Sequence, residues 1–251
     1  MKQNKLKNLI FSKKNKSGRN HTGRITVRRR GGGHKRLYRK VNYNFISSLF
    51  QILSTEYDPN RNINISIVRC LISGKFDYIL LNKGVNPGDI VKTDGRIING
   101  GRYSLKELPP NYLVNNIELR PYSGGQLARS SGTFCKILQK DYKKSLVRLK
   151  LPSLEERFVN INCKGTVGQI SNNFCHIKKL RKAGNSRWLG RRPSVRGVAM
   201  NPVDHPHGGG EGKTSGGRVS VTPWGHITIG KITRSKRKFT NSLVFKRRKQ
   251  F

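Results

Sequence analysis

Acidic residues are scarce in this sequence. It has 12 Asp and Glu against 52 Lys and Arg, a formal net charge of +40 over 251 residues. Folding alone does not explain such self-repulsion, so the charge predicts a permanent polyanionic partner. Nucleic acid fits best, because phosphates that pair with Lys and Arg release their counterions. An anionic membrane fits less well. There is no long basic amphipathic stretch, and no apolar run approaches the roughly 20 residues that span a bilayer.

Paired cysteines are also lacking. The four cysteines show no CxxC pair and no regular spacing (Cys70, Cys135, Cys163 and Cys175). A zinc site needs Cys or His pairs at short spacing, which Cys175-His176 alone does not provide. We therefore expect free thiols, buried or half-buried, in a reducing compartment. The first residues also lack the apolar region and small-residue cleavage site of a secretory signal.

The few acids lie mostly in the middle of the chain. Residues 1–55 hold 15 Lys and Arg and no acid, whereas residues 56–156 hold 16 Lys and Arg with 10 acids. Residues 157–251 hold 21 Lys and Arg, and their acids are Asp204 and Glu211. We expect the two basic ends to make most of the contact with the polyanion.

Short apolar runs fill the central part. Between residues 34 and 180, runs such as "FDYILL" and "SLVRLKLPS" alternate with turn signals such as "NPGD". Many short strands at close spacing favour small β-barrels over one large sheet. A boundary falls at "KELPPN", since prolines do not occupy a strand interior. A short helix is predicted at 174–183, ended by Gly184.

The outer parts show little apolar periodicity. Such segments bury too little apolar surface to fold alone, and a long irregular loop indicates folding against another molecule. We therefore predict a mostly β chain in four parts. These are a basic N-terminal arm (1–33), a first barrel that binds RNA (34–109), a second barrel (110–180) and an irregular, glycine-rich basic region with its tail (181–251).

The glycine-rich stretch "HGGGEGKT" at 207–214 is superficially similar to a nucleotide-binding loop. Such a loop needs G-x-x-x-x-G-K-[ST] between a strand and a helix. Counting back from Gly212, the first glycine of that pattern would stand where the sequence has His207. Prolines before the stretch exclude a buried strand, and no helix pattern follows it. The sequence therefore does not indicate an NTPase.

The same loop carries Asp204, His205 and His207 between restricting prolines. Three chemistries are conceivable. The three residues could form a metal site, or His205 could act as an acid–base catalyst of an RNA-processing enzyme. Alternatively, the imidazoles could pack on RNA while the carboxylate holds a guanine edge or a hydrated magnesium ion. The neighbouring glycines permit close backbone approach, which favours RNA packing.

Two further stretches combine positive charge with aromatic residues. Residues 28–40 read "RRRGGGHKRLYRK", and with no acid among the first 55 residues they favour RNA contact over an ordinary solvated face. In "RWLGRRPSVRG", Trp188 lies among arginines and could either stack on a base or serve as a small core residue. Trp224 is predicted to be a packing anchor.

With these motifs in view, the chain resembles the large-subunit ribosomal protein L2 family in its bacterial and organellar form. The matching segments cover most of the chain in order, and the last is highly specific. They include "SGRNHTGRIT" (17–26), "RRGGGHKRLYR" (29–39), "EYDPNRN" (56–62), "GGQLARSSGT" (124–133) and "GVAMNPVDHPHGGGEG" (197–212).

The resemblance implies an oligonucleotide-binding (OB)-type barrel followed by an SH3-like barrel, with an extended basic arm and an irregular C-terminal extension. It also implies a structural, non-catalytic role in primary rRNA binding, subunit assembly and association, and support of the peptidyl transferase centre. His205 matches a family histidine once suspected of a part in peptide-bond formation, and we interpret its role as organising RNA.

The resemblance and the basic motifs together give the expected contact residues. Those expected at rRNA are Arg28, Arg29, Arg30, Gly31, Gly32, Gly33, His34, Lys35, Arg36, Arg39, Lys40, Arg129, Lys182, Arg187, Trp188, Arg191, Arg192, Arg196, Asn201, Asp204, His205, His207, Gly208, Gly209, Gly210, Lys213, Arg218, Lys231, Arg234, Lys236, Arg237 and Lys238. Those expected near the peptidyl transferase centre are Met200, Asn201, Asp204, His205, His207 and Gly208.

The expected partners are large-subunit rRNA, neighbouring ribosomal proteins and the small subunit at an intersubunit contact. We expect no membrane span, no homo-oligomer, no catalytic or metal-ligating residue, and no cofactor beyond magnesium ions that accompany rRNA. The abundance of Lys, Asn and Ile suits an A/T-rich organellar genome, so we predict a mitochondrial (matrix) ribosome, with a plastid ribosome as the alternative. The apolar stretch 44–54 departs from the family, and it either meets a neighbouring protein or fills the barrel.

Overall fold

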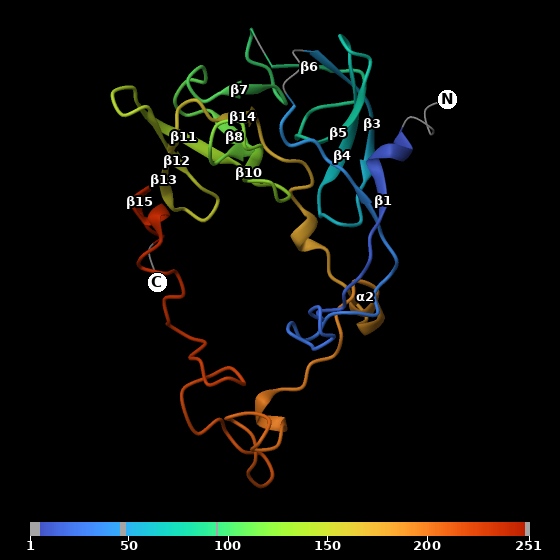
Figure 1. Cartoon of the computed structure of the whole chain (residues 1–251), viewed down its shortest axis with the longest axis vertical. Helices are drawn as coiled ribbons and strands as arrows, with labels where there is room; N and C mark the ends of the chain where they lie inside the picture. The colour runs from blue at the N-terminus through green and yellow to red at the C-terminus, as the bar shows by residue number, and fades with distance from the viewer. Residues whose placement is uncertain (1–5, 46–48, 94, 249–251) are drawn as a thin grey trace. The chain divides into compact units, whose positions relative to one another are not determined.

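The computed structural model describes residues 6–45, 49–93 and 95–248, so part of the apolar stretch 44–54 (residues 46–48) lies outside the described residues. The chain forms two compact units (Figure 1). The first unit comprises residues 1–14, 35–179 and 239–251, and the second comprises residues 15–34 and 180–238. Strands dominate the first unit, which confirms the predicted mostly β fold.

A four-stranded antiparallel sheet comes first in the chain. Its order is β5-β4-β3-β6, formed by β3 (Leu49–Tyr57), β4 (Asn64–Cys70), β5 (Phe76–Leu80) and β6 (Ile90–Lys92). Strand β4 is buried on both faces: Ile65 and Ile67 belong to one apolar cluster, and Val68 and Cys70 to another. This explains why its sequence is nearly continuously apolar rather than alternating.

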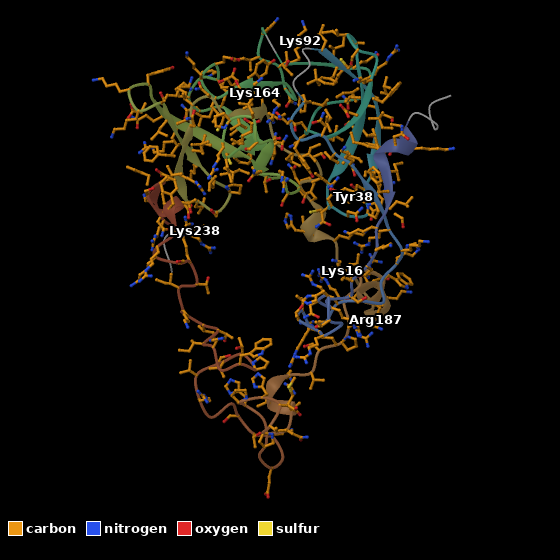
Figure 2. All side chains as sticks on the ribbon, in the orientation of Figure 1. Lys16, Tyr38, Lys92, Lys164, Arg187 and Lys238 are labelled. Carbon is orange, nitrogen blue, oxygen red and sulfur yellow. The ribbon has the colours of Figure 1, made fainter. Side chains whose placement is uncertain are left out.

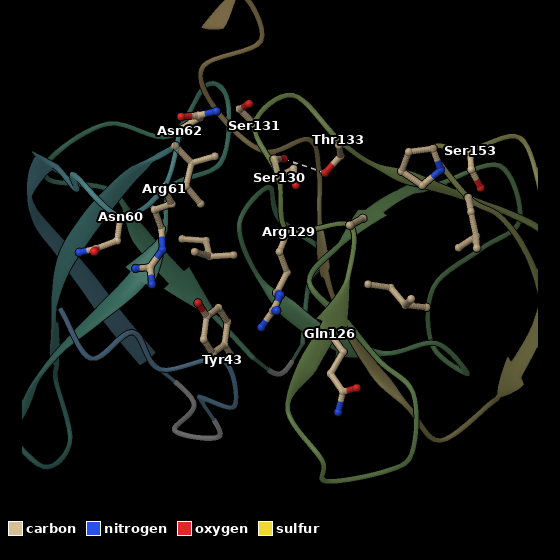
Figure 3. A pocket seen from close by; sticks show the side chains of 16 residues that line it. Tyr43, Asn60, Arg61, Asn62, Gln126, Arg129, Ser130, Ser131, Thr133 and Ser153 are labelled. Carbon is tan, nitrogen blue, oxygen red and sulfur yellow. Dashed lines mark hydrogen bonds between the residues drawn. The ribbon is translucent and has the colours of Figure 1, made fainter. Parts of the chain in front are cut away.

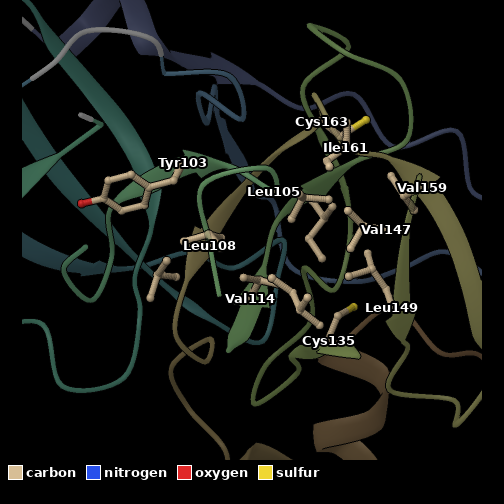
Figure 4. Close-up of a cluster of buried hydrophobic side chains, with 13 residues drawn as sticks. Tyr103, Leu105, Leu108, Val114, Cys135, Val147, Leu149, Val159, Ile161 and Cys163 are labelled. Carbon is tan, nitrogen blue, oxygen red and sulfur yellow. The ribbon is translucent and has the colours of Figure 1, made fainter. Parts of the chain in front are cut away.

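A seven-stranded sheet follows, in the order β15-β13-β12-β11-β8-β14-β7. Its strands are β7 (Arg102–Ser104), β8 (Leu113–Asn115), β11 (Cys135–Asp141), β12 (Leu146–Lys150), β13 (Glu156–Asn160), β14 (Lys164–Val167) and β15 (Val244–Lys246). The short pair β9 (Ile117–Glu118) and β10 (Gly125–Leu127) lies in the same part of the chain. The core that Figure 4 shows includes Leu105, Val114, Val147 and Leu149, all fully buried.

The two sheets follow the expected order of an OB-type part and then an SH3-like part. Among the described residues, the end strands of neither sheet pair with each other, so hydrogen bonding leaves both sheets open. Two strands were not predicted. β1 (Ile10–Ser12) pairs with β2 (Leu37–Arg39), and Leu6 is buried in the adjacent apolar cluster. The tail strand β15 pairs with β13 at the edge of the larger sheet.

The helix predicted at 174–183 is wrong. Only a 3-10 turn, η2 (Cys175–Ile177), forms there, and the α-helix α2 (Ala183–Trp188) begins later. Gly184 lies inside α2 rather than ending it, and the chain turns instead at Gly190, which has φ +84°. Other 3-10 turns are η1 (Lys7–Leu9), η3 (Gly197–Ala199) and η4 (Phe239–Asn241).

All four cysteines are free, and all are buried except Cys175, which is half-buried. This confirms the prediction of buried or half-buried thiols. Burial raises the pKa of Cys135 to about 12. Burial, reinforced by the negative charge of Glu118, also raises the pKa of Cys163 to about 12. Both thiols therefore stay protonated and unreactive at neutral pH. The described residues include no helix with the length and apolar character that a membrane crossing requires.

A fully buried ion pair joins β7 to β9. Arg102 Nη2 donates to Glu118 Oε1 at 2.8 Å, and both side chains have no solvent exposure. Burial lowers the pKa of Arg102, and the opposing charge of Glu118 counteracts that shift. Glu118 also accepts the backbone N–H groups of Tyr122 and Lys164. The pair thereby fixes the loop after β9, and its carboxylate has several partners, as a buried charge requires.

Candidate nucleic-acid interface

A cleft of about 660 Å³ opens in the first unit, lined mainly by residues 60–63 and 126–131. Two guanidinium groups, those of Arg61 and Arg129, point into it, with Tyr43 beside them (Figure 3). No Asp or Glu lines the cleft. Because Arg61 pairs with the buried Asp58, Arg129 is the cation of this cleft best placed for an anionic ligand.

The local structure holds both arginines in place. The guanidinium of Arg129 lies 4.6 Å from the ring centre of Tyr43, and its Nη1 donates to the Gly125 carbonyl at 3.3 Å. Arg61 Nη1 lies 2.6 Å from the carboxylate of the buried Asp58. Arg129 was predicted from the sequence, whereas Arg61 and Tyr43 were missed.

Hydroxyl and amide groups complete the cleft wall. They come from the residues labelled in Figure 3: Asn60, Asn62, Gln126, Ser130, Ser131, Thr133 and Ser153. Such groups donate to phosphate oxygens, ribose hydroxyls and base edges. The sequence "DPNR" is typical of the turn that brings Asn60 and Arg61 to the cleft. In this turn the Asp58 carboxylate accepts the backbone N–H of Asn60.

The structure divides the basic stretch 28–40 between the two units. Residues 35–40 belong to the first unit and lead into β2, where Arg36 Nη1 donates to the Pro59 carbonyl at 3.0 Å. The guanidinium of Arg61 lies 5.8 Å from the ring centre of Tyr38. This half of the stretch therefore lies on the turn that supplies one wall of the cleft.

Residues 28–34 belong to the second unit and lie against the segment that follows α2. Gly31 N–H donates to the Gly190 carbonyl at 3.0 Å, and His34 N–H donates to the Trp188 carbonyl at 3.0 Å. A Cβ on Gly33 would come within 2.7 Å of the Gly190 Cα, so only glycine fits this crossing. Figure 2 labels two basic residues of the second unit, Lys16 and Arg187, the latter within α2.

The crossing brings predicted residues together that are distant in sequence. Arg30 and Arg191 form a backbone bridge, and Arg192 N–H donates to the Arg29 carbonyl at 3.1 Å. Four arginines are thereby gathered from two segments about 160 residues apart in the chain. The sequence predicted each segment as an RNA contact but gave no sign that they join.

The loop around His205 closes on itself. Gly208 N–H donates to the His205 carbonyl at 2.8 Å and Gly209 N–H to the Met200 carbonyl at 3.0 Å. A Cβ on Gly208 would lie 2.2 Å from the Asn201 carbonyl oxygen, which confirms that the glycines serve close backbone approach. His205 is 8% exposed, and its ring stacks on that of His207 at 5.2 Å.

Both histidine rings form hydrogen bonds with backbone groups. His205 Nδ1 accepts the His207 N–H at 3.0 Å. His207 Nε2 accepts the Val221 N–H at 3.0 Å, so its Nδ1, 3.0 Å from the Gly216 carbonyl, is the donor. The lone pair that His207 would offer a metal is therefore already used, and no group of three potential metal ligands occurs among the described residues. Both rings therefore help to hold the backbone of the loop in place.

Both tryptophans of the second unit are exposed. Trp188 is 60% exposed, and Lys182 Nζ lies 5.5 Å from its ring centre. Trp224 is 67% exposed, with the guanidinium of Arg28 at 5.6 Å. The prediction that Trp224 is a packing anchor is wrong, because the second unit has no apolar cluster for it to join. Exposed rings beside cations are suited to stacking on bases.

The other predicted contact residues beyond 192 also belong to the second unit. Their side chains are exposed, except that of Arg234, which is half-buried. They are Arg196, Asn201, Asp204, Lys213, Arg218, Lys231, Arg234, Lys236, Arg237 and Lys238.

Comparison with known proteins is consistent with this picture. Residues 6–93 match the family model "Ribosomal Proteins L2, RNA binding N-terminal domain", and residues 99–225 match "Ribosomal Proteins L2, C-terminal domain". A large ribosomal subunit protein uL2c of Psilotum nudum is 47% identical over 249 residues, covering 97% of this chain and 89% of the relative. A large ribosomal subunit protein uL2 of Wolbachia pipientis is 47% identical over 243 residues, covering 96% and 88%. The chain therefore belongs to the family of ribosomal proteins L2.

Proposed function

We propose that this chain is a non-catalytic constituent of an organellar large ribosomal subunit that helps to assemble the subunit and to join it to the small subunit. Membership of the L2 family makes it a structural, rRNA-binding protein. The observation that carries the proposal is the composition of the second unit, with 19 Lys and Arg, two acids and no apolar cluster. Such a unit needs a polyanion to offset its repulsion.

Each part has a role in this proposal. The four-part division predicted from the sequence stays a proposal, with the cleft around Arg129 as a primary rRNA site. We further propose that the loop from Met200 to Gly208 supports the peptidyl transferase centre, organising RNA there without acting as an acid or base. The closed backbone of this loop and its stacked histidines support that role.

We propose a mitochondrial ribosome, with a plastid ribosome as the alternative. The support is the Lys-, Asn- and Ile-rich composition. Fractionating mitochondria and plastids and probing each for the protein tests this point, and recovery in plastids alone would overturn the mitochondrial assignment.

Sedimentation of organelle lysate over a salt series tests the main proposal. We expect the protein to travel with the large subunit at moderate salt and to leave it only when many phosphate contacts are screened. A protein that runs mostly free at physiological salt would contradict the proposal. The loop of Asp204, His205 and His207 would then have to be assayed for RNA cleavage in the purified chain.

A further inference from the structure

The second unit contains a concavity of about 500 Å³. No acidic and no aromatic residue lines it. The lining is dominated by five arginines: Arg19, Arg28, Arg29, Arg30 and Arg192.

A tight loop builds one side of this arginine concavity. Thr26 and Val27 N–H both donate to the Gly18 carbonyl, at 3.0 and 3.1 Å. Gly18 has φ +74°, and a Cβ there would lie 2.1 Å from the Val27 carbonyl oxygen, so the turn requires glycine. The Asn20 side chain accepts the N–H groups of Thr22 and Arg24 and closes the turn. Local bonds therefore fix the wall that carries Arg19 and Arg28.

The segment that follows α2 builds the other side of the concavity. Its Arg192 N–H donates to the Arg29 carbonyl, and Gly31 N–H donates to the Gly190 carbonyl beside it, so the two segments are held together. The concavity is complete only when both segments are together. Gly33 is the position that permits this, because any Cβ there would clash with Gly190.

The charges of the concavity have no acid to balance them. The second unit, all of whose residues the structure describes, contains only Asp204 and Glu211 as acids, and neither forms an ion pair with these arginines. Five guanidinium groups around one space repel each other unless an anion enters. Guanidinium binds phosphate in a bidentate manner, which makes phosphate the matching anion.

The lining favours a sugar–phosphate backbone over a base. Base recognition in single strands relies on aromatic stacking, and no ring lines the space. The volume of the concavity lies in the range of pockets that bury most of a drug-sized ligand. Such a ligand is larger than one phosphate group, so the space can hold more than one.

We propose that this concavity binds a bend of the rRNA backbone through at least two phosphates and thereby joins the N-terminal arm to the C-terminal extension. The inference rests on the proposed function and names the chemistry of one site within it. RNA that enters the concavity would stabilise the crossing of the two segments, because both supply its arginines.

The salt dependence of binding tests this. We would measure the affinity of the full chain for a large-subunit rRNA transcript over a KCl series, comparing the wild type with the double variant Arg30→Gln/Arg192→Gln. Losing two phosphate contacts should reduce the slope of log K against log salt by roughly 1.4–1.8. The matched control is Arg24→Gln/Arg181→Gln, which removes one exposed arginine from each of the same two segments outside the concavity. Its slope should change by less than about 0.7.

A charge-neutral variant tests the geometry. Gly33→Ala should separate the two segments and reduce the slope as the double arginine variant does, although no charge is lost. Gly184→Ala is its control, since that position has open space for a Cβ and lies within α2. Circular dichroism of each variant would confirm that the sheets of the first unit are intact.

The outcomes separate the inference from the proposed function. Equal slope losses in the two arginine double variants, or a wild-type slope in Gly33→Ala, would overturn the concavity as a site while leaving rRNA binding in place. A wild-type chain with no salt-dependent affinity for the transcript would instead overturn the proposed function.

Discussion

The two units of this chain achieve order by different means. The first unit buries three apolar clusters beneath its sheets. The second unit has Val221 as its only buried apolar side chain and is held by glycine crossings, turns and histidine bonds to the backbone. The first therefore has a hydrophobic driving force of its own, whereas the second depends on a partner that neutralises its charge.

Charge shows the same contrast. The first unit balances 33 Lys and Arg with 10 acids, and it contains the ion pairs Arg61–Asp58, Arg102–Glu118 and Arg148–Glu156. The second has 19 Lys and Arg with two acids. We therefore expect the first unit to fold by itself and the second to need RNA, and three sets of substitutions test this contrast.

The largest effect is expected from Glu118→Ala. It leaves Arg102 buried without its partner, which should cost about 3–5 kcal/mol in the free energy of unfolding of the first unit. Urea unfolding followed by circular dichroism would measure it. As a control, Arg102→Met/Glu118→Leu removes both charges and should recover most of the loss. A Glu118→Ala chain as stable as the wild type would show that the pair does not stabilise the first unit.

The next comparison pairs an apolar residue from each unit. Leu149→Ala opens a cavity in the core of the first unit and should cost about 2–5 kcal/mol. Val203→Ala, at a side chain that is 90% exposed in the second unit, should change the free energy of unfolding by no more than about 0.5 kcal/mol. The same urea titrations apply. If both substitutions lowered the free energy of unfolding by a similar amount, the second unit would have an apolar core, and the two units would not differ in this respect.

The smallest effect is expected from His207→Ala. It removes the bonds to Val221 N–H and the Gly216 carbonyl, a loss of roughly 1–2 kcal/mol confined to the loop. Hydrogen exchange of peptides that contain Val221 should accelerate about tenfold, while peptides from β12 stay unchanged. His226→Ala, at an exposed histidine of the same unit, is the control. Faster exchange in β12 would mean that the two units are energetically coupled.

Sequence reasoning was most successful where composition or regular pattern carries the information. The net charge predicted a polyanionic partner, the short apolar runs predicted β structure, and the motif at 197–212 indicated the family. Sequence reasoning was wrong where it took a single residue as evidence for a local structure. Gly184 was taken as the end of a helix and Trp224 as an anchor, but glycine also tolerates a helix interior, and an aromatic ring is buried only where a core exists.

The sequence by itself determined the charge, the strand-forming segments and the residue types that meet RNA, because these are properties of composition and local pattern. Only the tertiary structure decided which segments meet. It divided residues 28–40 between the two units, brought Arg61 to the same cleft as Arg129, and joined Arg29 to Arg192 across a glycine crossing. The physical reason is that such contacts depend on chain paths fixed by distant packing and by positions where a Cβ cannot fit, neither of which leaves a periodic trace in the sequence.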